Sequence, residues 1–83
     1  MAGKLTATAV KNATQPGRYS DGGNLHLYVK EAERRTWVFR YMRRGKSRDM
    51  GLGAYPDVSL SEARERAATA RKLLRDGIDP LQD

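Results

Sequence analysis

Hydrophobic and polar residues alternate strictly over residues 25–29. Leu25, Leu27 and Val29 occupy every second position, and the residues between them are polar or amphipathic. This period of two is typical of a strand with one buried face. The segment before it, residues 15–24, is rich in Gly, Pro and Asp, which favour tight reversals of the chain. We therefore predict a turn region followed by a strand whose aliphatic face points inward.

The strongest strand pattern covers residues 36–42, in which β-branched and aromatic residues predominate. Trp37, Phe39 and Tyr41 share one face of this strand. Large aromatic rings bury much apolar area, whereas Arg40 on the opposite face would be costly to bury without a partner. The aromatic face is therefore predicted to point inward.

A third strand is predicted after a hairpin turn. Residues 43–46, with the sequence RRGK, contain the glycine that a tight hairpin connection favours. Residues 46–52 then form a shorter strand with Met50 and Leu52 inward. Together the three strands form an antiparallel meander.

The second half of the chain carries the clearest helix pattern. Ser59 and Glu62 have the spacing of a capping box, and Gly77 provides the end of the helix. Small and apolar residues recur at intervals of three and four, as on one face of a helix. These residues are Leu60, Ala63, Ala67, Ala70 and Leu74.

The elements combine into an α+β fold, with a three-stranded antiparallel sheet packed on one C-terminal helix. The helix is the only predicted element long enough to cover the apolar face of such a sheet. A further short helix is predicted over residues 6–12, with Thr6 as its N-cap. The second face of the sheet is left to solvent.

Length and composition restrict the functions open to the chain. Its 83 residues suit one domain, and a chain of this size buries only about 60% of the surface exposed when unfolded, so a deep catalytic cavity is not expected. It has no cysteine, no long apolar stretch and no signal-peptide pattern. We expect a cytoplasmic protein without a cofactor, ordered over residues 5–77, with residues 78–83 as the start of a linker.

The positive charge is confined to one part of the sequence. The chain carries 16 Lys and Arg against 10 Asp and Glu, a net charge of +6. Eight of these cations and only two of the anions lie within residues 30–48, so this stretch alone carries +6 and the remainder is neutral. A localised basic patch is the usual footprint of a polyanionic partner. Nucleic-acid binding is the first hypothesis, and a merely solvated basic hairpin is its alternative.

Catalytic and metal-binding patterns are weak by comparison. His26 is the single histidine, and no nucleophile or orienting group stands at a recognisable spacing from it. Glu62 and Glu65 lie one helical turn apart, which capping and solvation explain. No cluster has the spacing of a metal site. The pattern predicts a binding module and not an enzyme.

The candidate DNA-binding residues lie on outward strand positions and at the rims of the predicted hairpins. Arginine can grip phosphates or contact guanine through two hydrogen bonds, and Tyr and His can donate to phosphates or bases. A two-stranded ribbon also fits the major groove of B-DNA. The predicted DNA-binding residues are His26, Tyr28, Arg34, Arg35, Arg40, Arg43, Arg44, Lys46 and Arg48.

Three motifs, in order, carry a resemblance to a known family: YSDGGNLHLYV, TWVFRYMRRGKSRDMGLGAYPDVSLSEAR and GIDP. Over residues 5–80 the chain resembles the N-terminal arm-type DNA-binding domain of phage and genomic-island integrases of the tyrosine recombinase family. The resemblance implies a three-stranded sheet on a helix, with the sheet placed in the major groove of arm sites that flank a crossover core. Asn24 stands where a third glycine is common and His26 where an aromatic residue is common. No base preference can therefore be carried over.

The resemblance also implies that this chain lacks a catalytic domain and that it has several binding partners. The recombinase catalytic residues belong to a domain beyond residue 83, so the chain is expected to be the DNA-binding module of a longer enzyme. Its implied partners are double-stranded DNA, other integrase subunits and accessory DNA-bending proteins, with no membrane. The implied location is the bacterial cytoplasm, at the nucleoid.

Two alternative functions remain open from the residues alone. If the strand faces were reversed, Trp37, Phe39 and Tyr41 would form a stacking platform for single-stranded nucleic acid. In the other alternative, the basic hairpin docks an acidic protein or another recombinase subunit.

Overall fold

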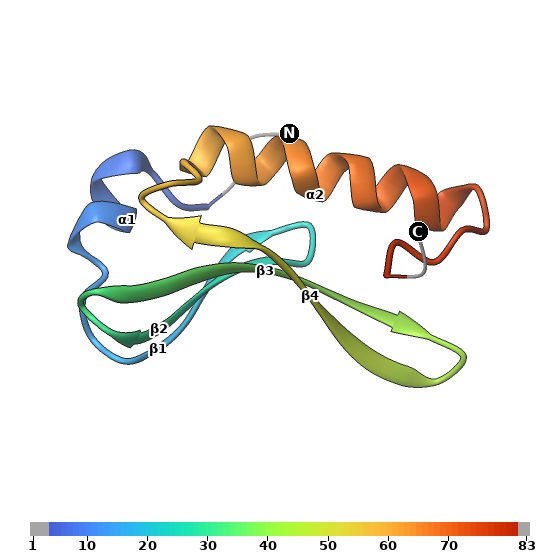
Figure 1. The fold of residues 1–83 in the computed structure, drawn as a ribbon, viewed down its shortest axis with the longest axis horizontal. Coiled ribbons are helices and arrows are strands. Elements are labelled where there is room, and N and C mark those ends of the chain that lie inside the picture. Colours follow the sequence, from blue (N-terminus) through green and yellow to red (C-terminus); the bar gives the residue numbers. More distant parts are fainter. Residues whose placement is uncertain (1–3, 82–83) are drawn as a thin grey trace.

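A computed structural model describes residues 4–81 of the chain. A four-stranded antiparallel sheet is covered on one face by helix α2 (Leu60–Arg75), and the short helix α1 (Ala7–Asn12) lies beside the start of α2 (Figure 1). The strands are neighbours in chain order: β1 (Gly17–Gly22), β2 (Leu25–Glu31), β3 (Arg34–Arg43) and β4 (Lys46–Tyr55).

The sheet has four strands, so the prediction of three was wrong. The additional strand, β1, lies in the segment interpreted as a turn region, and it pairs with β2 through Arg18 opposite Tyr28 and Ser20 opposite His26. As an edge strand it forms backbone hydrogen bonds on one side only, and its side chains are mostly exposed, which leaves little apolar alternation to detect. Gly17 and Gly22 are the two ends of the strand, and Gly23 and Asn24 form the turn from β1 into β2.

The predicted hairpin at RRGK is confirmed, and the strand after it is longer than predicted. Arg44 and Gly45 form a two-residue connection with positive φ angles of 54° and 78°, as a type I′ turn requires. Strand β4 continues to Tyr55 instead of ending at Leu52, and its pairing with β3 shifts register between Trp37 and Val38. The bulge at that shift interrupts the alternation of inward and outward residues along β4. The sequence pattern therefore did not predict that the strand continues past Leu52.

The predicted inward faces of the strands form the core beneath α2. Leu27, Trp37 and Phe39 are 0% exposed, and the indole N–H of Trp37 donates to the carbonyl of Val58 at 2.7 Å. Tyr41 is 3% exposed. The prediction that the aromatic face is buried is therefore confirmed. The reversed arrangement required by the single-stranded nucleic-acid alternative is wrong, because these rings offer no stacking surface.

Helix α2 begins and ends as its sequence pattern predicts. Ser59 and Glu62 form the capping box, with each side chain accepting from the other residue's backbone N–H. At the other end, the N–H of Ile78 donates to the carbonyl of Leu73 and the N–H of Gly77 to that of Leu74, which is a Schellman motif. The small residues of the predicted stripe let the helix approach the sheet closely, and Ala63 and Ala67 are 0% exposed.

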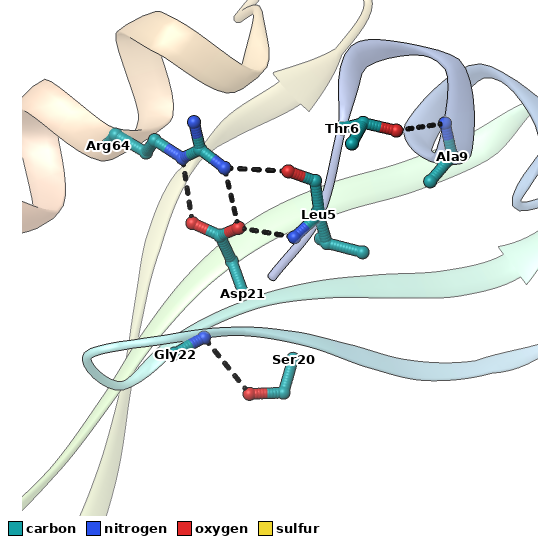
Figure 2. Close-up of polar contacts among 7 residues, drawn as sticks. All are labelled: Leu5, Thr6, Ala9, Ser20, Asp21, Gly22 and Arg64. Carbon is teal, nitrogen blue, oxygen red and sulfur yellow. Dashed lines mark hydrogen bonds and ion pairs between the residues drawn. The ribbon is translucent and has the colours of Figure 1, made fainter. Parts of the chain in front are cut away.

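An arginine of α2 joins the N-terminal segment to the sheet (Figure 2). The guanidinium of Arg64 donates through Nε and Nη2 to the two carboxylate oxygens of Asp21, at 2.9 and 2.8 Å. Nη2 also donates to the carbonyl of Leu5 at 2.8 Å, and the N–H of Leu5 donates to Asp21 at 2.9 Å. Three segments of the chain thus meet at one buried ion pair. The short helix that follows is confirmed, with Thr6 as its N-cap.

The segment after α2, which was predicted to be the start of a linker over residues 78–83, packs on the sheet through Asp79. Asp79 is 3% exposed and accepts a hydrogen bond from the Tyr41 hydroxyl at 2.5 Å. Its carboxylate also lies 3.2 Å from Arg48 and 3.8 Å from Arg43. A buried carboxylate is stable only with such partners. Their contacts with Asp79 hold the chain against the sheet beyond residue 77. The linker itself stays a prediction, and residues 82–83 lie outside the described residues.

Candidate nucleic-acid interface

The sheet face opposite α2 is polar and is called the outer face below. The register of the four strands brings its side chains together from all four of them. The outer face consists of Arg18, Ser20, His26, Tyr28, Thr36, Val38, Arg40, Met42, Ser47 and Asp49. Three of the nine predicted DNA-binding residues, His26, Tyr28 and Arg40, belong to it.

A polar network crosses the outer face. The Tyr28 hydroxyl on β2 donates to Asp49 on β4 at 3.4 Å, over the intervening strand β3. Arg40 donates through Nε to the Ser47 hydroxyl at 2.9 Å, and the same nitrogen lies 3.7 Å from Asp49. The guanidinium of Arg18 lies over the Tyr28 ring, 5.0 Å from its centroid. These contacts hold several long side chains in defined positions before any ligand arrives.

The apolar members of the outer face differ in exposure. Val38 lies on the same face of β3 as Arg40, yet it is only 6% exposed. Val38 also lines an open hollow of about 690 Å³ on this face, together with Arg18, Tyr28 and Thr36. Met42 is 66% exposed. An apolar floor with polar walls and a free thioether can contact a base edge or a thymine methyl.

His26 sits beside the Tyr28 ring, with the two ring centroids 6.2 Å apart. Partial burial lowers the pKa of His26, and the positive charge of Arg40 lowers it further. At neutral pH the imidazole is therefore uncharged, with one nitrogen that donates and one that accepts. In this state it adds hydrogen-bonding capacity to the outer face rather than charge.

The β3–β4 hairpin projects beyond the other strands as a two-stranded ribbon (Figure 1). Strand β2 begins at Leu25, opposite Phe39, so the pairs from Arg40 and Asp49 outward have no strand beside them. Arg44 and Lys46 are exposed at its tip, and neither side chain forms a hydrogen bond or an ion pair within the described residues. Two of the predicted cations are thus free to meet a phosphate.

The other four predicted cations have partners or lie off the outer face. Arg43 and Arg48 point to the helix side and face Asp79, as described above. Arg35 donates to the carbonyls of Val10 and Lys11 at 2.8 and 3.1 Å, which closes the last turn of α1. Arg34 is exposed at the start of β3, 3.6 Å from Glu31.

Sequence reasoning missed Arg18. This arginine lies on β1, the strand interpreted as a turn, and outside the basic stretch of residues 30–48. Its Cα is paired with that of Tyr28, which places both side chains on the outer face. The alternation of Arg18 and Ser20 with Tyr19 and Asp21 was the available signal, although turn residues surround it.

Residues 4–81 contain neither a cluster of metal ligands nor a helix that could span a membrane. No group of three or more His, Cys, Asp or Glu residues is arranged to hold a metal ion in this part of the chain. No helix within the same residues is both long and apolar enough to cross a membrane.

Comparison with known proteins places the chain in a family of DNA-binding domains. The family described as "Arm DNA-binding domain" matches residues 5–83. The chain belongs to this family. The arm domain is 42% identical over 74 residues to the integrase of Shigella phage Sf6 and to the prophage integrase IntS of Escherichia coli K12, covering 89% of this chain in both cases. It is 34% identical over 82 residues to the integrase of Enterobacteria phage P4, covering 93% of the chain.

These relatives are much longer than the arm domain. The matched region makes up 19% of the length of each of the three integrases. The chain thus spans about a fifth of the curated relatives that it matches, and the similarity concerns their arm domains.

Proposed function

We propose that this chain binds double-stranded DNA sequence-specifically, at arm-type sites, by inserting the outer face of its sheet into the major groove. The observation that carries the proposal is the outer face itself, on which Arg18, Tyr28 and Arg40 converge on the side of an arm DNA-binding domain left uncovered by its helix. In this proposal the chain is the N-terminal module of a longer integrase of the tyrosine recombinase family. The integrase relatives support that assignment.

In this proposal, different parts of the outer face and the ribbon contact the bases and the phosphates. A two-stranded ribbon enters the major groove, where base edges present their donors and acceptors. The part of the outer face formed by β1 and β2, with Arg18 and Tyr28, suits base contacts, and Arg44 and Lys46 at the ribbon tip suit phosphates. Arg43 and Arg48 approach DNA with their charge already shared with Asp79, so we assign them a smaller part.

Duplex titration at several salt concentrations tests the proposal. If four to six phosphates are neutralised, log K plotted against log salt concentration falls with a slope of about −4 to −5. Amide NMR on the same samples locates the interface, with shifts expected in β2, β3 and the ribbon tip. Shifts confined to α2 would contradict insertion of the sheet. Absence of duplex binding at low salt would contradict DNA binding altogether and favour a protein partner.

The Arg18→Ala variant is expected to weaken duplex binding about tenfold, because Arg18 presents a guanidinium already held over the Tyr28 ring. The matched control is Arg75→Ala, which removes the same charge from the exposed end of α2. This control is expected to change affinity less than about twofold, since long-range charge is screened within about 10 Å at 0.1 M salt. Equal losses for the two variants would contradict the assignment of the outer face.

A further inference from the structure

One carboxylate lies among the cations and hydroxyls of the outer face. The side chain of Asp49 is 48% exposed, and Asp49 is the single acid at the paired strand positions that define that face. Glu33, in the connection between β2 and β3, lines the hollow at the other end of the face. Phosphates repel a carboxylate, so an acid on a DNA-binding surface costs affinity for every duplex. A residue that weakens all complexes equally gives no discrimination, whereas one that weakens incorrect complexes more increases it.

The contacts of Asp49 leave its carboxylate available to a ligand. Its two partners within the described residues are Tyr28 at 3.4 Å and Arg40 at 3.7 Å, both of them long contacts. Arg40 has its shorter hydrogen bond to Ser47, at 2.9 Å. A carboxylate can accept about four hydrogen bonds, so the Asp49 oxygens keep acceptor capacity in the free protein. The neighbours orient the group without saturating it.

We propose that Asp49 is a specificity-determining residue that accepts a hydrogen bond from an exocyclic amino group of a base in the major groove. This inference rests on the proposed function, since it requires the outer face to enter that groove. Cytosine N4 is the donor that suits a carboxylate best, because the amino group of adenine stands beside the N7 acceptor, which repels a carboxylate, and guanine presents only acceptors to this groove. A duplex without an amino group at that position leaves the charge desolvated and unpaired beside phosphates.

The variant Asp49→Asn separates this role from net charge and from folding. Asparagine keeps the shape and one acceptor oxygen but removes the negative charge. Its matched control is Glu65→Gln, the same charge change at an exposed position of α2, on the opposite side of the sheet. The side chain of Asp49 is exposed, so both variants are expected to melt within a few degrees of the unchanged protein.

The experiment begins with selection of a preferred duplex from a random-sequence library by the unchanged chain. The unchanged chain and the two variants are then titrated with that duplex and with a scrambled duplex of equal composition, at the same salt concentration. Asp49→Asn is expected to bind the scrambled duplex about tenfold more tightly and the selected duplex no more tightly. Its salt slope on the scrambled duplex should steepen by about 0.9. Glu65→Gln should leave the ratio of the two affinities unchanged.

Three results would overturn the inference, and one of them would also overturn the proposed function. If Asp49→Asn keeps the ratio of the two affinities, Asp49 takes no part in specificity, while the proposed function stands. If Glu65→Gln lowers the ratio equally, the effect is one of net charge alone, and again only the inference fails. If the unchanged chain selects no sequence from the library, the proposed sequence-specific function fails first and the inference fails with it.

Discussion

Replacing Arg64 by alanine is expected to lower the free energy of unfolding by about 2–3 kcal/mol. The change leaves the Asp21 carboxylate, which is 4% exposed, with only the N–H of Leu5 as a described partner. Removing one member of a buried pair is costlier than the pair is worth, because the remaining charge is desolvated. We place the loss below that of a fully buried pair, since the Arg64 side chain is 38% exposed and water can reach the site.

Urea unfolding followed by Trp37 fluorescence measures this loss, because the single tryptophan is fully buried. Arg75→Ala serves as the control on the same helix and should stay within about 0.5 kcal/mol of the unchanged protein. Arg64→Lys should recover only part of the loss, since an ammonium cannot form the two parallel hydrogen bonds of the guanidinium. Full recovery with lysine would show that charge alone, and not the fork geometry, holds the three segments together.

The same pair makes the loss dependent on pH. Burial would raise the pKa of Asp21, but hydrogen bonds from Arg64 and the N–H of Leu5 outweigh it, so this pKa lies below its ordinary value in the folded protein. A lowered pKa contributes stability above the ordinary value, and the contribution is lost as pH falls through the folded-state pKa. The difference between Arg64→Ala and the unchanged protein should therefore shrink below about pH 4. A difference that stays constant down to pH 2 would contradict the ion pair as its cause.

Replacing Gly53 by alanine is expected to cost about 3 kcal/mol, from backbone strain and overpacking together. Gly53 has a φ angle of +122°, which L side chains rarely adopt. A Cβ atom there would also collide with the side chain of Val58 and come within 3.3 Å of Arg66. Val58 is 5% exposed and holds the Trp37 indole through its carbonyl, so it has little room to move.

Gly51→Ala is the matched control on the same strand. An added Cβ at Gly51 meets no atom within 4 Å, and its φ angle lies outside the positive region. We expect a loss below about 1 kcal/mol in the same urea titration. Equal losses at the two positions would mean that strand propensity, rather than the close approach of Val58, decides the cost.

The parts of the fold that the sequence predicted are those with a local periodic pattern. Leu25 and Leu27 define a buried strand face by alternation alone, and Ser59 with Glu62 define a helix start by their spacing. Strand β1 lacks such a pattern, because it is an edge strand with glycine at both ends. The packing of Asp79 depends on Tyr41, 38 residues earlier, and no short window of sequence contains both.

The sequence predicted on which face of the sheet the candidate site lies. It did not predict which of the cations are already paired with other groups of the protein. Counting cations over residues 30–48 treats each of them as equally available to DNA. In the structure Arg35 caps α1 and Arg48 faces a buried acid, so neither contributes a free charge to the outer face. Arg18 lies outside the counted stretch and reaches the outer face through strand pairing. Tertiary contacts determine which cations are available to a ligand, and these contacts cannot be read from the composition of the sequence.

The packing of Asp79 also determines on which side of the sheet the described chain ends. Its partners Tyr41, Arg43 and Arg48 lie on the helix side of the ribbon, so the chain reaches Leu81 on that side. Leu5 is likewise held on the helix side, by Arg64. Both ends of the described chain therefore emerge behind the sheet. Neither described end of the chain stands between the outer face and an approaching duplex.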